Sequence, residues 1–191
     1  GVLYALHNPE MLEFLSRAEL SETSLVARPF HPDEIRAIRA RHTCPIVFVA
    51  LGMSAQFTQP VSVEGVEAHF YVTEGVPLTG SNVTVIPYST LHTQDYVAAA
   101  DCVITKAGWG TVVECLLAQK PMALFARDSV LEDRTTICKL EQKKLGIKVT
   151  YEQLTEMSDL LEQMKQITYP AVPEYHNAAA EIISKLLTLT E

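Results

Sequence analysis

The residues of this sequence with the clearest chemical potential gather around two glycines, Gly108 and Gly110, which are followed by Thr111. An apolar run at 102–105 precedes them and a helical pattern begins near Thr111, which places the glycines in a strand-to-helix turn. Backbone N–H groups at a helix N-terminus bind anions, and Lys106 adds a mobile cation beside them, so a diphosphate would match these donors. The alternative is that the glycines only permit a sharp turn, and spacing alone does not separate the two hypotheses.

Glu114 follows Thr111 by three residues, and Thr-x-x-Glu is a capping box in which the carboxylate bonds the backbone of its own helix. The functional alternative is that Glu114 accepts hydrogen bonds from both hydroxyls of a ribose beside the phosphate site. The pattern alone favours the cap. Trp109, the only tryptophan, stands in the tight turn, where an aromatic side chain is more often a packing anchor than a stacking platform. The spacing lacks the third glycine of the dinucleotide fingerprint and the Gly-Lys-Ser/Thr ending of a Walker A motif.

The elements around these residues predict an α/β fold. Apolar runs typical of buried strands lie at 46–51, 69–73, 83–87, 102–105, 121–126 and 147–150. Helical patterns lie at 32–41, 94–101, from 111 onward, 134–145, 151–167 and 174–189. Their alternation predicts a Rossmann-like, doubly wound parallel sheet of about six strands. Helix signals are weak only between 55 and 67, where we expect an irregular or shortened element.

Ligands of such sheets bind beyond the carboxyl ends of the strands. Glycine and polar residues collect at four of those ends, at 52–54, 87–89, 106–111 and 127–133. We therefore expect these segments to converge on one site.

Composition limits the classes of function. The net charge of −8 argues against broad binding of nucleic acid, which depends on basic surface. No apolar run approaches the roughly 20 residues of a membrane span, and the first residues show no signal peptide, so a cytoplasmic location is expected. The cysteines form no C-x-x-C pair and no disulfide framework, and we expect reduced thiols packed in the core. They are Cys44, Cys102, Cys115 and Cys138.

The histidines show no spacing typical of a catalytic triad or a metal site, so neither a metal nor a cofactor is expected. They are His7, His31, His42, His69, His92 and His176. His92 is the best candidate for a catalytic histidine because it lies in a loop near the expected site, although a surface role is the commoner one for such a residue.

Several segments together resemble the donor-binding half of GT-B glycosyltransferases, in particular the families of the murein UDP-GlcNAc transferase and the UDP-glycosyltransferases. The resemblance rests on Lys106–Glu114, Gln119–Met122, Glu132–Arg134 and Lys144–Gly146. Residues 49–54 resemble the first strand and Gly-Ser turn of that half, and residues 85–88 and 96–101 resemble the strand and helix before the glycine motif. The match covers about residues 44 to 150.

This resemblance implies a C-terminal domain that binds a nucleotide sugar, with a UDP-sugar as donor. Residues 1–30 would be a linker or the remnant of a preceding domain, and residues 31–191 would form the donor-binding domain. The implied diphosphate contacts are Gly52, Ser54, Lys106, Gly108, Trp109, Gly110 and Thr111. The backbone around Ile86 and Tyr88 would read the base, Glu114 would bind the ribose, and Asp133 and Arg134 would face the donor sugar.

The resemblance also implies transfer without a metal, in which helix N–H groups and Lys106 stabilise the departing diphosphate. In this fold the acceptor site and the catalytic base usually belong to an N-terminal domain or partner subunit, so this chain alone is expected to be inactive, and any peripheral membrane association would come from that half. Thr135 and Thr136 follow Arg134 where relatives carry glutamine or Asp-Gln. A nucleotide-sugar epimerase or hydrolase, and a degenerate nucleotide-binding module without activity, therefore remain alternatives.

Overall fold

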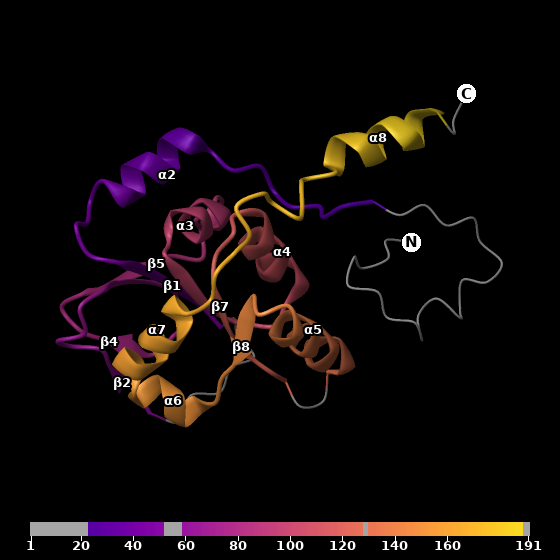
Figure 1. Ribbon diagram of the computed structural model, residues 1–191. Helices are drawn as coiled ribbons and strands as arrows, with labels where there is room; N and C mark the ends of the chain where they lie inside the picture. The colour runs from indigo at the N-terminus through magenta and orange to yellow at the C-terminus, as the bar shows by residue number, and fades with distance from the viewer. Residues whose placement is uncertain (1–22, 52–58, 128–129, 189–191) are drawn as a thin grey trace.

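The computed structural model describes residues 23–51, 59–127 and 130–188. Its centre is a sheet of six parallel strands in the order β5-β3-β1-β6-β7-β8 (Figure 1). The strands are β1 (Ile46–Ala50), β3 (His69–Thr73), β5 (Val83–Ile86), β6 (Cys102–Lys106), β7 (Met122–Phe125) and β8 (Gly146–Lys148). The predicted doubly wound, Rossmann-like sheet is thereby confirmed, with all six strands where apolar runs predicted them.

The strand order fixes where a ligand can bind. The chain runs outward from β1 through β3 to β5, then crosses back to β6 and runs outward again through β7 to β8. The winding direction therefore reverses between β1 and β6, and sheets of this class bind ligands beyond the carboxyl ends of the strands at that point. The Thr105 hydroxyl donates to the carbonyl of Ala50 over 2.8 Å and ties these two strand ends together.

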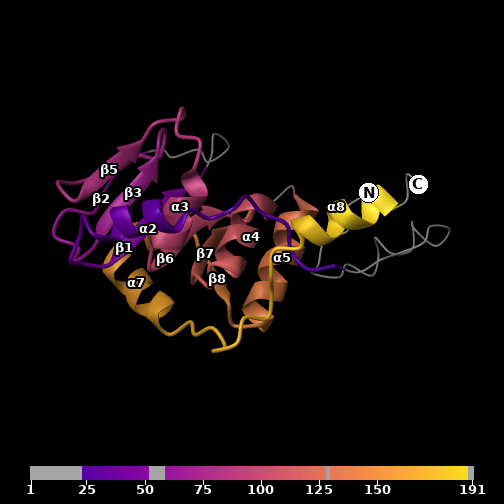
Figure 2. The same ribbon diagram turned by 90° about the horizontal axis from the view of Figure 1, so that it is seen from above.

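Helices cover both faces of the sheet (Figures 1 and 2). One face carries α2 (Pro32–Arg39), α3 (Thr93–Ala99), α4 (Trp109–Leu117) and α5 (Leu131–Gln142), and the other carries α6 (Tyr151–Thr155) and α7 (Met157–Lys165). Each face of the sheet has its own hydrophobic core, the first beneath α2–α5 and the second beneath α6 and α7. Within β1, Phe48 packs into the first core, whereas Val47 and Val49 pack into the second. This alternation of buried side chains is what a strand enclosed on both faces requires.

A second sheet, of two strands, lies in the described parts of the connections that follow β1 and β3. Strands β2 (Val61–Ser62) and β4 (Leu78–Thr79) pair in parallel, and Val61, Val63 and Leu78 join the second core. The expected irregular element between 55 and 67 is thus confirmed for its described part, 59–67. Gly65, with a φ of 81°, turns the chain there.

Two predicted helices have wrong boundaries. The helix expected at 151–167 is interrupted at Glu156, whose backbone (φ −108°, ψ 49°) is not helical and separates α6 from α7. The helix expected from residue 174 begins later, as α8 (Ala179–Thr188), because Asn177 forms a parallel bridge with Leu25. None of the helices in the described ranges is both long and apolar enough to cross a membrane.

The prediction of four core thiols is half wrong. Cys102 and Cys115 are buried, whereas Cys44 and Cys138 are exposed. Cys44 lies in the turn before β1, and Cys138 follows Ile137 on α5, one residue beyond the face that meets the core. Burial raises the pKa of the Cys102 thiol to about 12, which leaves it inert as a nucleophile.

A pair of stacked histidines at the amino ends of β1 and β3 should make stability depend on pH. The rings of His42 and His69 lie 3.7 Å apart, and His42 Nε2 is 2.8 Å from the hydroxyl of Tyr71. Burial lowers the pKa of both histidines, with Arg41 contributing at His42 and His42 contributing at His69. The unfolded chain therefore takes up these protons first, and this contribution to stability is lost as the pH falls below the ordinary histidine pKa of 6.5.

We expect the free energy of unfolding to fall more steeply in the native chain than in a His42→Gln variant between about pH 7.5 and about pH 5.5. Glutamine keeps an amide donor for Tyr71 but cannot be protonated. Urea unfolding at several pH values measures the difference. Parallel pH profiles for the two proteins would contradict the prediction.

Candidate functional site at the carboxyl edge of the sheet

The N-terminus of α4 opens at the carboxyl end of β6. Gly108 is the residue before the helix, with an extended backbone (φ −73°, ψ 128°) and no side chain that could cap it. Its N–H donates to the carbonyl of Lys106 over 2.7 Å, and its carbonyl accepts from Val112 N–H over 3.1 Å, which closes the first helical turn. The helix therefore presents its positive dipole end at the point where the winding of the sheet reverses.

Backbone conformation does not require glycine at position 108 or 110, because neither residue has a positive φ. A Cβ on Gly110 would meet no atom of the described residues within 4 Å, so the first turn of α4 is open among them at this position. A Cβ on Gly108 would lie 3.3 Å from Cε of Lys106, so this glycine gives room to the lysine stem. These surroundings favour the anion-site hypothesis over the sharp-turn hypothesis.

The capping-box interpretation of Glu114 is wrong. The helix begins at Trp109, so Glu114 is its sixth residue and lies beyond the reach of a cap. Its Oε1 instead accepts a hydrogen bond from Nε of Arg28 over 2.9 Å and forms an ion pair with Nη2 of the same guanidinium at 2.8 Å. The Glu114 side chain is 7% exposed. Burial raises the pKa of the Glu114 carboxyl, the hydrogen bond and charge of Arg28 act against that rise, and Asp95 adds to it.

Arg28 is the site residue that the sequence did not reveal. Its guanidinium also donates to the carbonyl of Leu91 and to the hydroxyl of Thr93, each over 3.0 Å. It therefore joins the segment before α2 to the loop after β5, to the start of α3 and to helix α4. No local pattern could have indicated this, because the pairing with Glu114 spans 86 residues.

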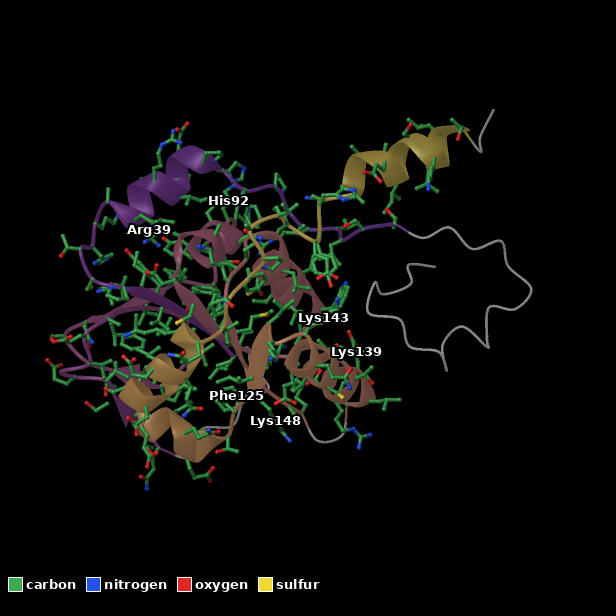
Figure 3. All side chains as sticks on the ribbon, in the orientation of Figure 1. Arg39, His92, Phe125, Lys139, Lys143 and Lys148 are labelled. Atoms are coloured by element: carbon green, nitrogen blue, oxygen red, sulfur yellow. The ribbon has the colours of Figure 1, made fainter. Side chains whose placement is uncertain are left out.

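A buried polar group lies beside this arginine at the start of α3. Asp95, 1% exposed, accepts from the backbone N–H of His31 over 2.8 Å and lies 2.8 Å from His31 Nδ1. The ring of His92 meets that of His31 edge-on at 4.6 Å. His92 lies directly before the first residue of α3 (Figure 3). Arg39 lies near the other end of this helix, where it donates to the carbonyl of Ala99.

The main-chain groups expected to read a base are engaged with Glu74. The carbonyl of Ile86 accepts from the N–H of Glu74 over 3.0 Å, and the N–H of Tyr88 donates to the Glu74 carboxylate over 3.2 Å. The Tyr88 hydroxyl lies over Gly75, although the residue is 60% exposed. Base contacts at these two residues remain a prediction.

Of the residues expected to face a donor sugar, Asp133 is enclosed and Arg134 is exposed. The Asp133 carboxylate accepts from Nε and Nη2 of Arg127 over 2.7 Å each and from the backbone N–H of Arg127 over 3.0 Å. Burial alone would raise the pKa of Asp133, but the hydrogen bonds and charge of Arg127, with Lys106 adding, hold it below its ordinary value. Lys106, at the end of β6, thus contributes to the electrostatics of Asp133 on α5.

The structure thus brings most of the predicted site residues to one edge of the sheet. Lys106, Gly108, Trp109, Gly110, Thr111 and Glu114 belong to a single strand-turn-helix unit, and Asp133 and Arg134 lie at the start of the neighbouring helix α5. Gly52 and Ser54 lie outside the described residues. Across the described ranges, no group of three or more histidine, cysteine, aspartate or glutamate side chains is placed to hold a metal ion.

Comparison with known protein families gives one match. The model of the glycosyltransferase family 28 C-terminal domain matches residues 46–189, which is more than half of the chain. Comparison with curated protein sequences finds no match. The family match confirms the resemblance to the donor-binding half of GT-B enzymes.

Solved structures of glycosyltransferases share the fold. SnogD from Streptomyces nogalater is 21% identical, with a TM-score of 0.53 over 78% of this chain and 44% of that one. VinC in complex with DTDP is 14% identical, with a TM-score of 0.56 over 90% and 49%. UGT2 of Phytolacca americana, complexed with UDP-2fluoro-glucose and pterostilbene, is 10% identical, with a TM-score of 0.55 over 87% and 46%. The chain therefore spans about half the length of these structures.

Proposed function

Because this chain belongs to the family of glycosyltransferase family 28 C-terminal domains, we propose that it binds the nucleotide sugar of a hexosyl transfer, with UDP as the nucleotide. The observation that carries this proposal is the open N-terminus of α4 between Lys106 and the buried carboxylate of Glu114. Gly110 and Glu114 are four residues apart, about 6 Å along a helix. A nucleoside diphosphate spans that separation with its phosphates on the helix end and its ribose at the carboxylate.

The proposed chemistry is electrostatic. The helix N–H groups and the Lys106 ammonium would stabilise the negative charge that develops on the departing diphosphate, the role that a metal plays elsewhere. The acceptor and the base that deprotonates it would come from another domain or subunit. Two neighbours of the same fold were solved with DTDP or with UDP-2fluoro-glucose, which supports a nucleotide diphosphate here.

The remaining assignments complete the proposal. Gly52 and Ser54 would add diphosphate contacts, the backbone at Ile86 and Tyr88 would meet the base, and Asp133 and Arg134 would lie toward the donor sugar. The donor domain would comprise residues 31–191, with 1–30 as a linker or preceding segment. A cytoplasmic location fits the exposed free thiols, because exposed thiols persist in a reducing compartment.

Calorimetric titration of the chain with UDP, TDP, GDP and uridine tests the proposal. We expect UDP to bind more tightly than the other diphosphates and far more tightly than uridine. Replacing Lys106 with methionine should weaken UDP about tenfold, the value of one charge-assisted contact, and leave uridine unchanged.

Lys165→Met is the matched control, because Lys165 is an exposed lysine of α7 that pairs with Glu162. It should bind UDP as the native chain does. Equal affinity of the native chain for UDP and uridine would overturn the diphosphate site. Tighter binding of TDP or GDP would overturn the choice of base alone.

A further inference from the structure

We infer that Arg28 is a positioning residue for donor binding: it stays on Oε1 of Glu114 when the nucleotide binds and turns the other oxygen, Oε2, toward the ribose. The inference rests on the proposed function, since it concerns how the same carboxylate recognises its ligand. It assigns a role to a residue that lies outside the span matched by the family model, which begins at residue 46.

The two oxygens of Glu114 have different surroundings. Oε1 accepts the hydrogen bond from Nε of Arg28 and lies 2.8 Å from Nη2 of the same guanidinium, so Arg28 occupies this oxygen. Oε2 has no hydrogen bond within the described part of the chain, and it is not among the buried polar atoms that lack a partner. Oε2 therefore keeps part of the little exposure that the Glu114 side chain retains. Two free lone pairs on Oε2 match the two hydroxyls of a ribose.

Arg28 is held in place by more than its ion pair. Nη1 donates to the carbonyl of Leu91 and Nη2 to the hydroxyl of Thr93, so displacement of the guanidinium by a ribose would break bonds to three elements. A ligand that uses Oε2 leaves all of these bonds intact. Retention of Arg28 is for that reason the less costly route to a bound complex.

The backbone that carries Arg28 is also fixed. Main-chain groups of every second residue from 25 to 31 bond to the rest of the domain, the pattern of an extended chain on a partner. The four bonds are Ala178 N–H to Leu25 O (2.7 Å), Asn177 Nδ2 to Ala27 O (2.9 Å), Gln94 Nε2 to Pro29 O (3.0 Å) and His31 N–H to Asp95 Oδ1 (2.8 Å). The guanidinium is thus preorganised before any ligand arrives.

Charge gives Arg28 a second effect on the same carboxylate. Glu114 is enclosed by its surroundings, and the nearby Asp95 adds a charge of the same sign. The hydrogen bond and charge of Arg28 act against the rise that burial causes in the pKa of Glu114 and so favour the ionised form, in which both oxygens accept hydrogen bonds. Removal of Arg28 therefore weakens ribose recognition without removing any atom that touches the ribose.

The test compares UDP with 2′,3′-dideoxy-UDP by calorimetry on the native chain and on Arg28→Gln, Arg28→Lys and Glu114→Gln. We expect Arg28→Gln to weaken UDP about tenfold and to leave the dideoxy nucleotide unchanged. Lysine should recover part of the loss, because it restores the charge without the two-pronged donor. Combining Arg28→Gln with Glu114→Gln should add little beyond Glu114→Gln alone.

Arg39→Gln is the matched control. Arg39 has the same side-chain exposure as Arg28, 47%, and bonds Asp101 and the other end of α3. It should leave both affinities as they are. Equal weakening of the two nucleotides by Arg28→Gln, or tighter binding of UDP, would overturn the inference, since the second result means that Arg28 competes with the ribose.

Failure of the native chain to bind UDP at all would overturn the proposed function instead. If Arg28→Gln does not fold, Arg28→Lys decides the matter, because a purely structural role predicts the same change for both nucleotides. Thermal unfolding of each variant accompanies the titrations.

Discussion

Replacement of Gly110 with aspartate should reduce the affinity for UDP at least about 100-fold while the chain stays folded. A Cβ at this position meets no atom within 4 Å in the part of the chain that the structure describes, so a side chain can be added there without a clash at its Cβ. An acidic residue in the first turn of a helix is favourable for the helix itself. The same charge placed against a diphosphate costs about 3 to 4 kcal/mol at an effective dielectric near 20. The stability of the chain and its affinity for UDP should therefore change independently of each other.

Gly110→Asn is the matched variant, because asparagine has the shape of aspartate without its charge. The difference in UDP affinity between the aspartate and asparagine variants measures electrostatic repulsion separately from the loss of space. Gly110→Ala should raise the melting temperature by about 1 to 4 °C, since alanine favours a helix over glycine by about 0.5 to 1 kcal/mol. Calorimetry with UDP and thermal unfolding measure both effects. An aspartate variant that binds UDP like the native chain would show that no phosphate approaches the N-terminus of α4.

The sheet could be predicted because its signals are local. A strand buried on both faces is a continuous apolar run, and residues 46–51 and 102–105 show such runs, each followed within three residues by a glycine. Once the order of strands and helices is known, right-handed crossovers leave few topologies open. The carboxyl edge followed from that topology, which is why Lys106, Gly110 and Glu114 were found together.

The structural features that could not be predicted from the sequence depend on pairings between distant residues. Strands β2 and β4 have two residues each, and their partners lie 17 positions apart, so no periodicity marks them. The contact between Arg28 and Glu114 is a long-range pair of the same kind. The capping-box interpretation of Glu114 was wrong for another reason: Thr-x-x-Glu has one sequence pattern whether the helix begins at Thr111 or, as here, at Trp109.

Of two cations at this edge of the sheet, one is paired within the protein and the other is available to a ligand. The two cations lie at the carboxyl ends of adjacent strands: Lys106 is the last residue of β6, and Arg127 lies just after β7. Arg127 is neutralised by Asp133, whereas Lys106 has no ion pair within the described ranges. An edge with one neutralised cation and one available cation suits an anion that binds at the α4 end, and this is the physical basis for placing the diphosphate there rather than beside α5.

Asp133 should contribute to stability through its ion pair with Arg127, and its replacement with alanine should destabilise the chain by about 3 kcal/mol, toward the lower limit for breaking a buried ion pair. The lower limit applies because Arg127, the partner left behind, is 35% exposed and can be rehydrated. The melting temperature should fall by about 6 to 12 °C for a chain of this size. Glu132→Ala, at the exposed neighbouring position, should cost less than about 0.5 kcal/mol.

The pH dependence of the Asp133→Ala effect distinguishes an ion pair from simple packing. Because the pKa of Asp133 is lowered in the folded chain, its contribution is complete above the ordinary carboxyl pKa of 3.8 and is lost as the pH falls through the lowered value. The stability difference between native and variant chains should therefore be constant near neutral pH and shrink below about pH 4. A difference that stays constant down to low pH would mean that lost packing destabilises the variant. If Asp133→Ala leaves the melting temperature unchanged but weakens a UDP-sugar more than UDP, the carboxylate serves the donor sugar instead.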